Sequence, residues 1–278
     1  ASVAKAFRQR CEESFREDQI RKDNTGGSKD PNYYATNYDP DNLPKVATSN
    51  FTELDKFSRM SKIRSGVGHD YSFNTSEYDP SGLNCKSMKH YFVPMGAPRE
   101  NRSYGLTPHS FEWMSIKFFA PADGIIVDVV YTDNQYGREA QFAIQSSEYG
   151  GYYFNFYHVR LLPDMVLGTP VTAGQQIGTL GHEESWGEMA VEVRVDSRES
   201  YLLSFLQVAT EEVLQIYRNR GVNSVSDVII TKEQRDAKPL ACDTSSEGRY
   251  FEGSYRYRGS EQFMVWQFES SDNWFFFD

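Results

Sequence analysis

Hydrophobic positions change their spacing repeatedly along the chain, and each change predicts a different structure. In residues 1–22 apolar side chains recur at roughly helical intervals among many charges, which predicts an amphipathic helix. Residues 23–50 are rich in Asp, Asn, Pro and Gly, and these turn formers predict a linker. Residues 51–62 have the spacing of a short helix, whereas residues 63–112 show no sustained period and predict a long, loop-rich segment.

From residue 113 onward the pattern becomes that of short strands separated by turns. The stretch "SIKFFAPADGIIVDVVYT" has an apolar run, a Pro-Ala-Asp-Gly turn and then alternating Ile and Val. "REAQFAIQSS" and "GYYFNFYHVRLL" follow, with "SEYGG" between them as a hairpin turn. "TPVTAGQQIGTLG" and "MAVEVRVD" complete the series. Short strands with Gly-rich turns predict a compact antiparallel sheet.

Residues 199–220 carry the clearest apolar face of the chain and predict a helix. Two arginines near its end, followed by Gly221, fit the chemistry of a helix C-terminus. The sequence after residue 222 ends in aromatic-rich stretches, which predict further β-structure. The apolar face consists of Leu202, Leu203, Leu206, Val213, Leu214 and Tyr217.

These elements predict a mainly β protein with flanking helices, of the α+β class. We expect three parts. Residues 1–50 form an N-terminal helix and turn-rich linker, and residues 51–198 form a β domain whose N-terminal part is loop-rich. Residues 199–278 form a helix and an aromatic, β-rich extension.

Composition narrows the classes of partner. The 278 residues have a formal net charge of -10, and non-specific nucleic-acid binding relies on a basic face, so nucleic acid is not an expected partner. No apolar run reaches the ~18 residues that a membrane-spanning helix needs. The three cysteines form no Cys-x-x-Cys pair, and we expect a disulfide between Cys85 and Cys242, which lie in polar, loop-like sequence.

Other features bear on location and on calcium. The chain begins Ala-Ser-Val-Ala, and Asn-x-Ser/Thr sequons occur at Asn50, Asn74 and Asn101. We therefore expect a secreted protein at the cell surface or outside the cell, with its leader already removed. The oxygen ligands of residues 23–42 suit a calcium ion, although their spacing differs from an EF-hand loop.

Residues 117–195 resemble the LytM/lysostaphin-type zinc endopeptidases of bacterial cell walls, the duplicated hybrid motif family. The matching pieces are "APADGIIVDVV", "YYFNFYHVRLLPDMVLGTPVTAGQQIGTLG" and "EVRV". Their centre is the pattern Gly-x-x-Val-x-x-Gly-Gln-x-Ile-Gly. The resemblance implies an antiparallel LytM-like sheet with a barrel-sandwich core.

The zinc ligands that the resemblance implies are incomplete in this chain. His158 stands where the family has the histidine of a Tyr-x-His motif. Glu188 and Ala190 stand where the family has His-x-His, and alanine cannot bind zinc. No histidine is followed four residues later by Asp, and His69-Asp70 is the nearest candidate for that motif. The residues therefore deny the usual zinc site while the scaffold remains.

Several side chains are candidates for the former groove. A rearranged site for zinc or another divalent ion would use His69, Asp70 and His158. Strand alternation puts Glu188, Ala190 and Glu192 on one face, which we expect to point to solvent. The candidate binding residues are His69, Asp70, His109, Trp113, His158, His182 and Glu188.

The preferred interpretation is a secreted, non-catalytic LytM-like protein. It would bind a cell-envelope glycan or peptide, or a protein partner, through the former active-site groove. One alternative is an active metallopeptidase or related hydrolase with a rearranged metal site. Another is a structural subunit of an extracellular assembly, in which the N-terminal helix and the aromatic C-terminal end make the contacts between subunits.

Overall fold

The computed structural model describes residues 33–72, 75–96, 110–134, 137–181, 186–244, 249–251 and 271–278. The helix predicted over residues 1–22 and the first half of the proposed calcium-binding loop, residues 23–32, lie outside the described residues. The same is true of His109 and His182. No helix among the described residues is long and apolar enough to cross a membrane.

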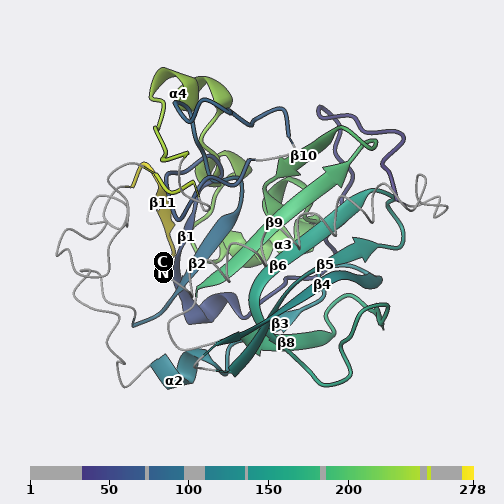
Figure 1. Ribbon diagram of the computed structural model, residues 1–278. Coiled ribbons are helices and arrows are strands. Elements are labelled where there is room, and N and C mark those ends of the chain that lie inside the picture. Colours follow the sequence, from purple (N-terminus) through teal and green to yellow (C-terminus); the bar gives the residue numbers. More distant parts are fainter. Residues whose placement is uncertain are drawn as a thin grey trace, which may run out of the picture.

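The described strands form one twisted antiparallel sheet (Figure 1). Its main path runs β11-β1-β2-β9-β6-β5-β4-β7, with β10 beside β9 and the β3–β8 pair attached to β6. The antiparallel β-sheet predicted for the chain is therefore confirmed. The strands are β1 (Phe57–Ser61), β2 (His90–Pro94), β3 (Lys117–Phe119), β4 (Gly124–Asn134), β5 (Gly137–Ser146), β6 (Tyr152–Leu161), β7 (Pro170–Val171), β8 (Gln176–Leu180), β9 (Gly187–Arg194), β10 (Ser200–Leu203) and β11 (Trp274–Phe276).

Helices are few and short. The prediction of flanking helices is met only in part, because the described helices have at most eight residues. One of them, α3, lies behind the sheet in Figure 1 and adds buried Val213 and Tyr217 to the main core. The helices are η1 (Leu54–Lys56), α2 (Ser110–Trp113), η2 (Phe205–Gln207), α3 (Glu211–Arg218), η3 (Val225–Val228) and α4 (Lys232–Ala237).

The sheet has a core face and an opposite face that carries the candidate site. Alternate residues of the central strands point into one hydrophobic core, as a period of two requires. Hydrophobic burial of this face is the main stabilising contribution that the strands make. The residues that β5, β6 and β9 contribute to this core include Phe142, Ile144, Phe154, Phe156, Met189, Val191 and Val193.

The helix predicted over residues 199–220 is wrong in its first half. Residues 200–203 form β10, which pairs antiparallel with β9, and only Glu211–Arg218 is α-helical. The physical reason is competition from sheet hydrogen bonds and from Ser204, whose side chain accepts from Leu206 N and caps η2 instead. The domain boundary expected at residue 198 therefore lies between two paired strands of one sheet.

The short helix predicted over residues 51–62 is also largely a strand. Only η1 is helical there, and β1 follows it directly, paired with β2 on one side and β11 on the other. The C-terminal stretch "NWFFFD" supplies β11, so the last described strand of the chain pairs with the first. Pairing with a distant strand has overridden the local helical spacing.

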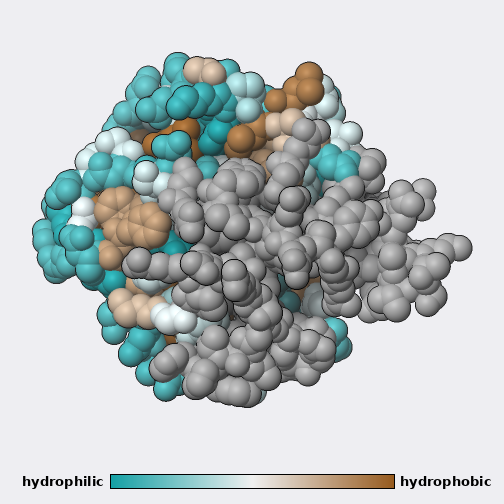
Figure 2. Space-filling model, turned by 90° about the vertical axis from the view of Figure 1, so that its left-hand side faces the viewer, coloured by the Kyte–Doolittle hydropathy of each residue, from teal (hydrophilic) through white to brown (hydrophobic). Residues whose placement is uncertain are grey.

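The described part of the surface beside β11 carries little exposed apolar area. Figure 2 shows this side, where the described surface is mostly hydrophilic and hydrophobic side chains form small, separate patches. One exposed aromatic residue of β11 is Phe276, which is 41% exposed. Scattered apolar side chains of this kind are normal on a protein surface.

Candidate functional site

The candidate site lies where β6 and β9 pair on the face opposite the core. Tyr157 is paired with Glu188, and Asn155 is paired with Ala190. Neighbouring residues of an antiparallel pair share a face, so these four side chains lie together. We call this surface the site face. The sequence alternation predicted that Glu188 and Ala190 share a face, and their neighbours Met189 and Val191 belong to the main core.

A bulge in β6 positions His158. Ala140 pairs with Val159 and Phe142 pairs with Phe156, so β6 has one residue more than β5 between these pairs. His158 occupies this bulge with a φ of 55°, a left-handed conformation that is rare for a bulky residue. Bulges re-aim side chains beside functional sites. Here the bulge brings the His158 Nδ1 to 2.9 Å from Glu139 Oε1 on β5.

Glu188 is buried rather than turned to solvent, which corrects the expectation of a solvent-facing acidic strand. Its Oε2 accepts a hydrogen bond from the ammonium of Lys89, which lies directly before β2. Its Oε1 lies 3.6 Å from His158 Nε2. The Lys89 and Glu188 side chains are 4% and 9% exposed. A carboxylate this deeply buried needs such cationic partners, because unpaired burial of a charge costs several kcal/mol.

Aromatic rings surround the Lys89 ammonium. Its Nζ lies 4.4 Å from the ring centroid of Tyr157, 4.9 Å from that of Tyr91 and 5.0 Å from that of Tyr71. The hydroxyls of Tyr71 and Tyr157 are also hydrogen-bonded to each other. Tyr91 can approach because residue 68 is glycine with a φ of 73°, and a Cβ there would collide with the Tyr91 hydroxyl.

The pKa values of the two histidines near Lys89 are shifted in opposite directions. Burial lowers the pKa of His158, but Glu188 and Glu139 together outweigh burial, so the net pKa is raised above its ordinary value. Burial, and after it Lys89, lower the pKa of His69 to about 4. Burial raises the pKa of Glu188, but Lys89 and His158 outweigh it, and the net pKa is lowered. The cluster thus combines two glutamates and a lysine with two histidines whose pKa values are shifted in opposite directions.

Asp70 does not share the site with its neighbour His69. The His69 Nδ1–H donates to the carbonyl oxygen of Asp70 at 2.8 Å, and its Nε2 lies 3.4 Å from Lys89 Nζ. The Asp70 side chain is fully buried elsewhere and forms an ion pair with Arg249 at 2.8 Å. Ser72 also donates to it at 2.8 Å. Asp70 therefore fastens the C-terminal segment rather than joining His158.

The disulfide predicted from the sequence between Cys85 and Cys242 is present in the structure. The disulfide lies beside the Asp70–Arg249 pair, since Arg249 Nη2 is 3.4 Å from Cys85 Sγ. Two cross-links, one covalent and one ionic, thus fasten Cys242 and Arg249 next to the loop that carries His69.

The residues of the site that the structure describes do not fit a catalytic zinc. A zinc site of this kind needs three protein ligands and an open position. Ala190 supplies none, and the ammonium of Lys89 occupies the position between Glu188 and His69. Within the described ranges, one group of three possible ligand atoms lies close enough together for one ion, in Asp70, Cys85 and Cys242. Both of its sulfur atoms are used by the disulfide.

The remaining predicted binding residue, Trp113, is a structural anchor. It lies at the end of α2, is 9% exposed, and its indole Nε1–H donates to the carbonyl oxygen of Met95 at 3.0 Å. Its ring belongs to the main core. The side chain is therefore used in packing, away from the residues around Lys89.

Sequence reasoning missed the residues that complete the cluster: Lys89, Glu139, Tyr71, Tyr91 and Tyr157. One signal was present, because a glutamate at a buried strand position requires a cationic partner. The signal names no partner, however, since Lys89 is 99 residues away from Glu188. The β6 bulge carries no sequence mark of its own, because the positive φ of His158 occurs at a position without the glycine that usually signals such a conformation.

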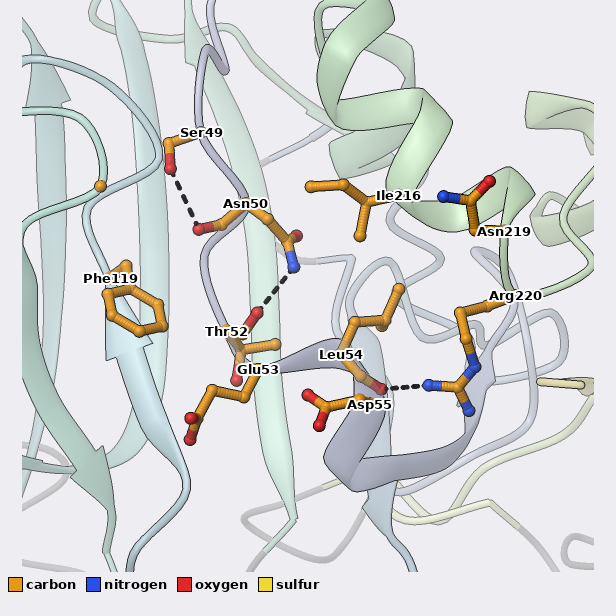
Figure 3. Close-up of a pocket in the computed structure, with 11 residues that line it drawn as sticks. Ser49, Asn50, Thr52, Glu53, Leu54, Asp55, Phe119, Ile216, Asn219 and Arg220 are labelled. Atoms are coloured by element: carbon orange, nitrogen blue, oxygen red, sulfur yellow. Dashed lines mark hydrogen bonds between the residues drawn. The ribbon is translucent and has the colours of Figure 1, made fainter.

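Another hollow of the surface, about 540 Å³ in volume, lies between residues 49–55 and the end of α3 (Figure 3). Its polar groups have structural partners. Arg220 donates to the carbonyl oxygens of Leu54 at 2.7 Å and Phe57 at 3.0 Å. The sequon residue Asn50 donates to Thr52 O and accepts from the Tyr217 hydroxyl. The polar groups of this hollow are therefore less available to a ligand than those of the site face.

Comparisons of this chain with known proteins gave matches among solved structures. No protein-family model matches the chain, and no curated protein matches its sequence. Among solved structures, the chain is similar to a putative glycyl-glycine endopeptidase LytM from Ruminococcus gnavus, with 15% identity and a TM-score of 0.26, over 34% of this chain and 39% of that one. It is also similar to Csd3 from Helicobacter pylori, with 10% identity and a TM-score of 0.30, over 63% and 40% of the two chains.

A further match is a chain of the SpoIIQ–SpoIIIAH pore-forming complex, with 11% identity and a TM-score of 0.34, over 63% of this chain and 97% of that one. The alignments with the first two structures span about two fifths of their length. All three matches have low sequence identity. With every TM-score below 0.5, they say nothing of the site or of its chemistry.

The histidines predict how stability depends on pH. Burial lowers the pKa of fully buried His90 to about 4, and His69 shifts in the same direction. The unfolded chain therefore binds protons below pH ~6.5 that the folded chain binds only near pH 4, so stability falls as pH drops through this window. His90 alone contributes about 3 kcal/mol to this loss. Urea unfolding between pH 7 and pH 4 measures it.

The pKa of His158 is shifted in the opposite direction, so this residue serves as the control. Its raised pKa adds stability that is fully present below pH ~6.5 and is lost as pH rises through the folded pKa. His90→Gln should reduce the fall of unfolding free energy between pH 7 and pH 4. His158→Gln should leave that fall as large as in the wild type or make it larger. If unfolding free energy fell as steeply with pH in His90→Gln as in the wild type, this prediction would be contradicted.

Proposed function

We propose that this chain is a non-catalytic, LytM-like module of the cell envelope or cell surface, which binds an envelope peptide or glycan, or a protein partner, through the site face. The observation that carries the proposal is the buried pair of Lys89 and Glu188. It puts an organic cation, fixed by the chain itself, beside the residues that would have to hold a hydrolytic metal. Charge and shape, rather than activation of water, are then what this face offers.

Polar and aromatic groups at the rim support a binding role. Tyr71, Tyr157 and His158 are partly exposed beside the buried ion pair. Next to them, the Nδ2 of Asn155 has no hydrogen-bond acceptor among the described residues. A buried amide donor without an acceptor costs ~1–3 kcal/mol unless water or a ligand satisfies it. A peptide carbonyl or a sugar hydroxyl would suit that donor, with the tyrosine rings beside it.

The test is a titration of the whole chain, labelled with nitrogen-15, with soluble disaccharide-peptide fragments of cell wall. We expect chemical-shift changes around Asn155 and Tyr157 and no cleaved product. Asn155→Ala should weaken binding about 5-fold, the equivalent of one lost hydrogen bond. The matched control is Thr172→Ala, at an exposed threonine in the turn between β7 and β8. Catalytic release of cleaved fragments, abolished by His158→Ala, would contradict the proposal.

A further inference from the structure

We propose that three tyrosine rings, a carboxylate and an imidazole form a built-in ammonium site, which Lys89 fills from within the chain in place of a divalent metal ion. This inference rests on the proposed non-catalytic function and explains how the chain excludes a metal ion from the site. The site consists of Tyr71, Tyr91, Tyr157, Glu188 and His69.

The hydrogen-bonding groups match an ammonium. A lysine ammonium has three N–H donors and no acceptor. Glu188 Oε2 accepts one of them, and His69 Nε2 lies 3.4 Å from the same nitrogen. His69 is able to accept there because its Nδ1–H is already donated to the Asp70 carbonyl oxygen. The low pKa of His69 keeps the ring neutral at pH 7, as an acceptor must be.

The aromatic rings favour an organic cation over a metal. All three centroids lie within the ~6 Å at which a ring face attracts an ammonium. Ring faces offer no lone pair for coordination, and burial raises the pKa of the Tyr71 and Tyr157 hydroxyls, which keeps them protonated. Zinc prefers four N, O or S ligands. Besides the rings, the described contacts of this position are one carboxylate oxygen and one imidazole nitrogen.

The ammonium also joins parts of the fold that are distant in sequence. Lys89 precedes β2, Glu188 is on β9 and Tyr157 is on β6, so one cation connects three strands of the sheet. Tyr71 and His69 add the loop that leads toward the disulfide. A structural metal holds distant ligands together in the same way. Here the cation is covalently part of the chain and cannot be removed by a chelator.

The experiment restores the cation from solution. Lys89→Ala removes the atoms that n-propylammonium supplies. We expect propylammonium chloride to raise the melting temperature of this variant by several degrees above the value in equal sodium chloride. The wild type should not respond in this way. Lys89→Met is the matched control, because it fills the space without charge and should not respond either.

Two measurements on the wild type complete the test. Nitrogen-15 spectra of lysine Nζ at pH 7 should show one ammonium group whose protons exchange slowly with water, and its signal should be lost in Lys89→Met. Titration calorimetry should show no stoichiometric zinc binding. If Lys89→Ala fails to fold, an Nζ signal that exchanges as fast as surface lysines overturns the inference. A folded Lys89→Ala without propylammonium response overturns it too, but leaves the proposed binding function standing. Stoichiometric zinc binding to the wild type that Glu188→Gln abolishes overturns both.

Discussion

Replacing Glu188 by alanine should lower the free energy of unfolding by about 3–5 kcal/mol, the range for breaking a buried ion pair from one side. The Lys89 side chain is only 4% exposed, so its charge would stay buried without the carboxylate that accepts from it. His158 would lose the same partner, although Glu139 would remain at 2.9 Å. Urea denaturation at pH 7 measures the loss as a shift of the transition midpoint.

Three further variants separate this effect from a general loss of acidic charge. Lys89→Met should cost less than Glu188→Ala, because His158 still faces Glu188. The double variant Lys89→Met, Glu188→Met should recover most of the loss, since apolar side chains can replace a buried pair of similar volume. Glu192→Ala is the matched control: its side chain is 20% exposed, and its partner Arg194 also pairs with Asp128. Equal losses in Glu188→Ala and Glu192→Ala would refute the argument.

Removing the disulfide should be the other large effect. The double variant Cys85→Ser, Cys242→Ser should lose about 2–5 kcal/mol of unfolding free energy, because the bridge closes a loop with a sequence separation of 157 residues. Both cysteines are buried, so the serine hydroxyls would also have to find partners there. Guanidinium unfolding of the variant and the wild type gives the difference.

A reducing agent supplies the control for this second prediction. Dithiothreitol should destabilise the wild type by a similar amount and leave the double serine variant unchanged. Hydrogen exchange should rise first in residues 242–244 and 249–251, which the disulfide and the Asp70–Arg249 pair fasten. Identical midpoints for oxidised and reduced wild type would show that the cross-link contributes nothing.

Local pattern was a reliable guide where short turns join strands that follow one another along the chain. The turn "SEYGG" lies between β5 and β6, and the Pro-Ala-Asp-Gly turn lies between β3 and β4. The alternation in β9 also sorted Met189 and Val191 to the core and Glu188 to the other face. Each of these features depends on residues close in sequence, where turn chemistry and a period of two carry the information.

Pattern misled where a distant strand competed with a local helix. Residues 200–203 have leucines at helical spacing, yet β9 offers them a complete ladder of hydrogen bonds. The same competition turned residues 57–61 into β1, between β2 and β11. Helix propensity is a weak preference of a few tenths of a kcal/mol per residue, so pairing within a large sheet outweighs it.

The sequence by itself determined the antiparallel scaffold and showed that Ala190 cannot serve as a zinc ligand. It also placed Glu188 on the face opposite the core. Only the tertiary structure decided that Glu188 is buried, that Lys89 neutralises it and that Tyr71, Tyr91 and Tyr157 surround the ammonium. The physical reason is that a buried charge must find its partner in space, and here that partner is separated from it by 99 residues of chain.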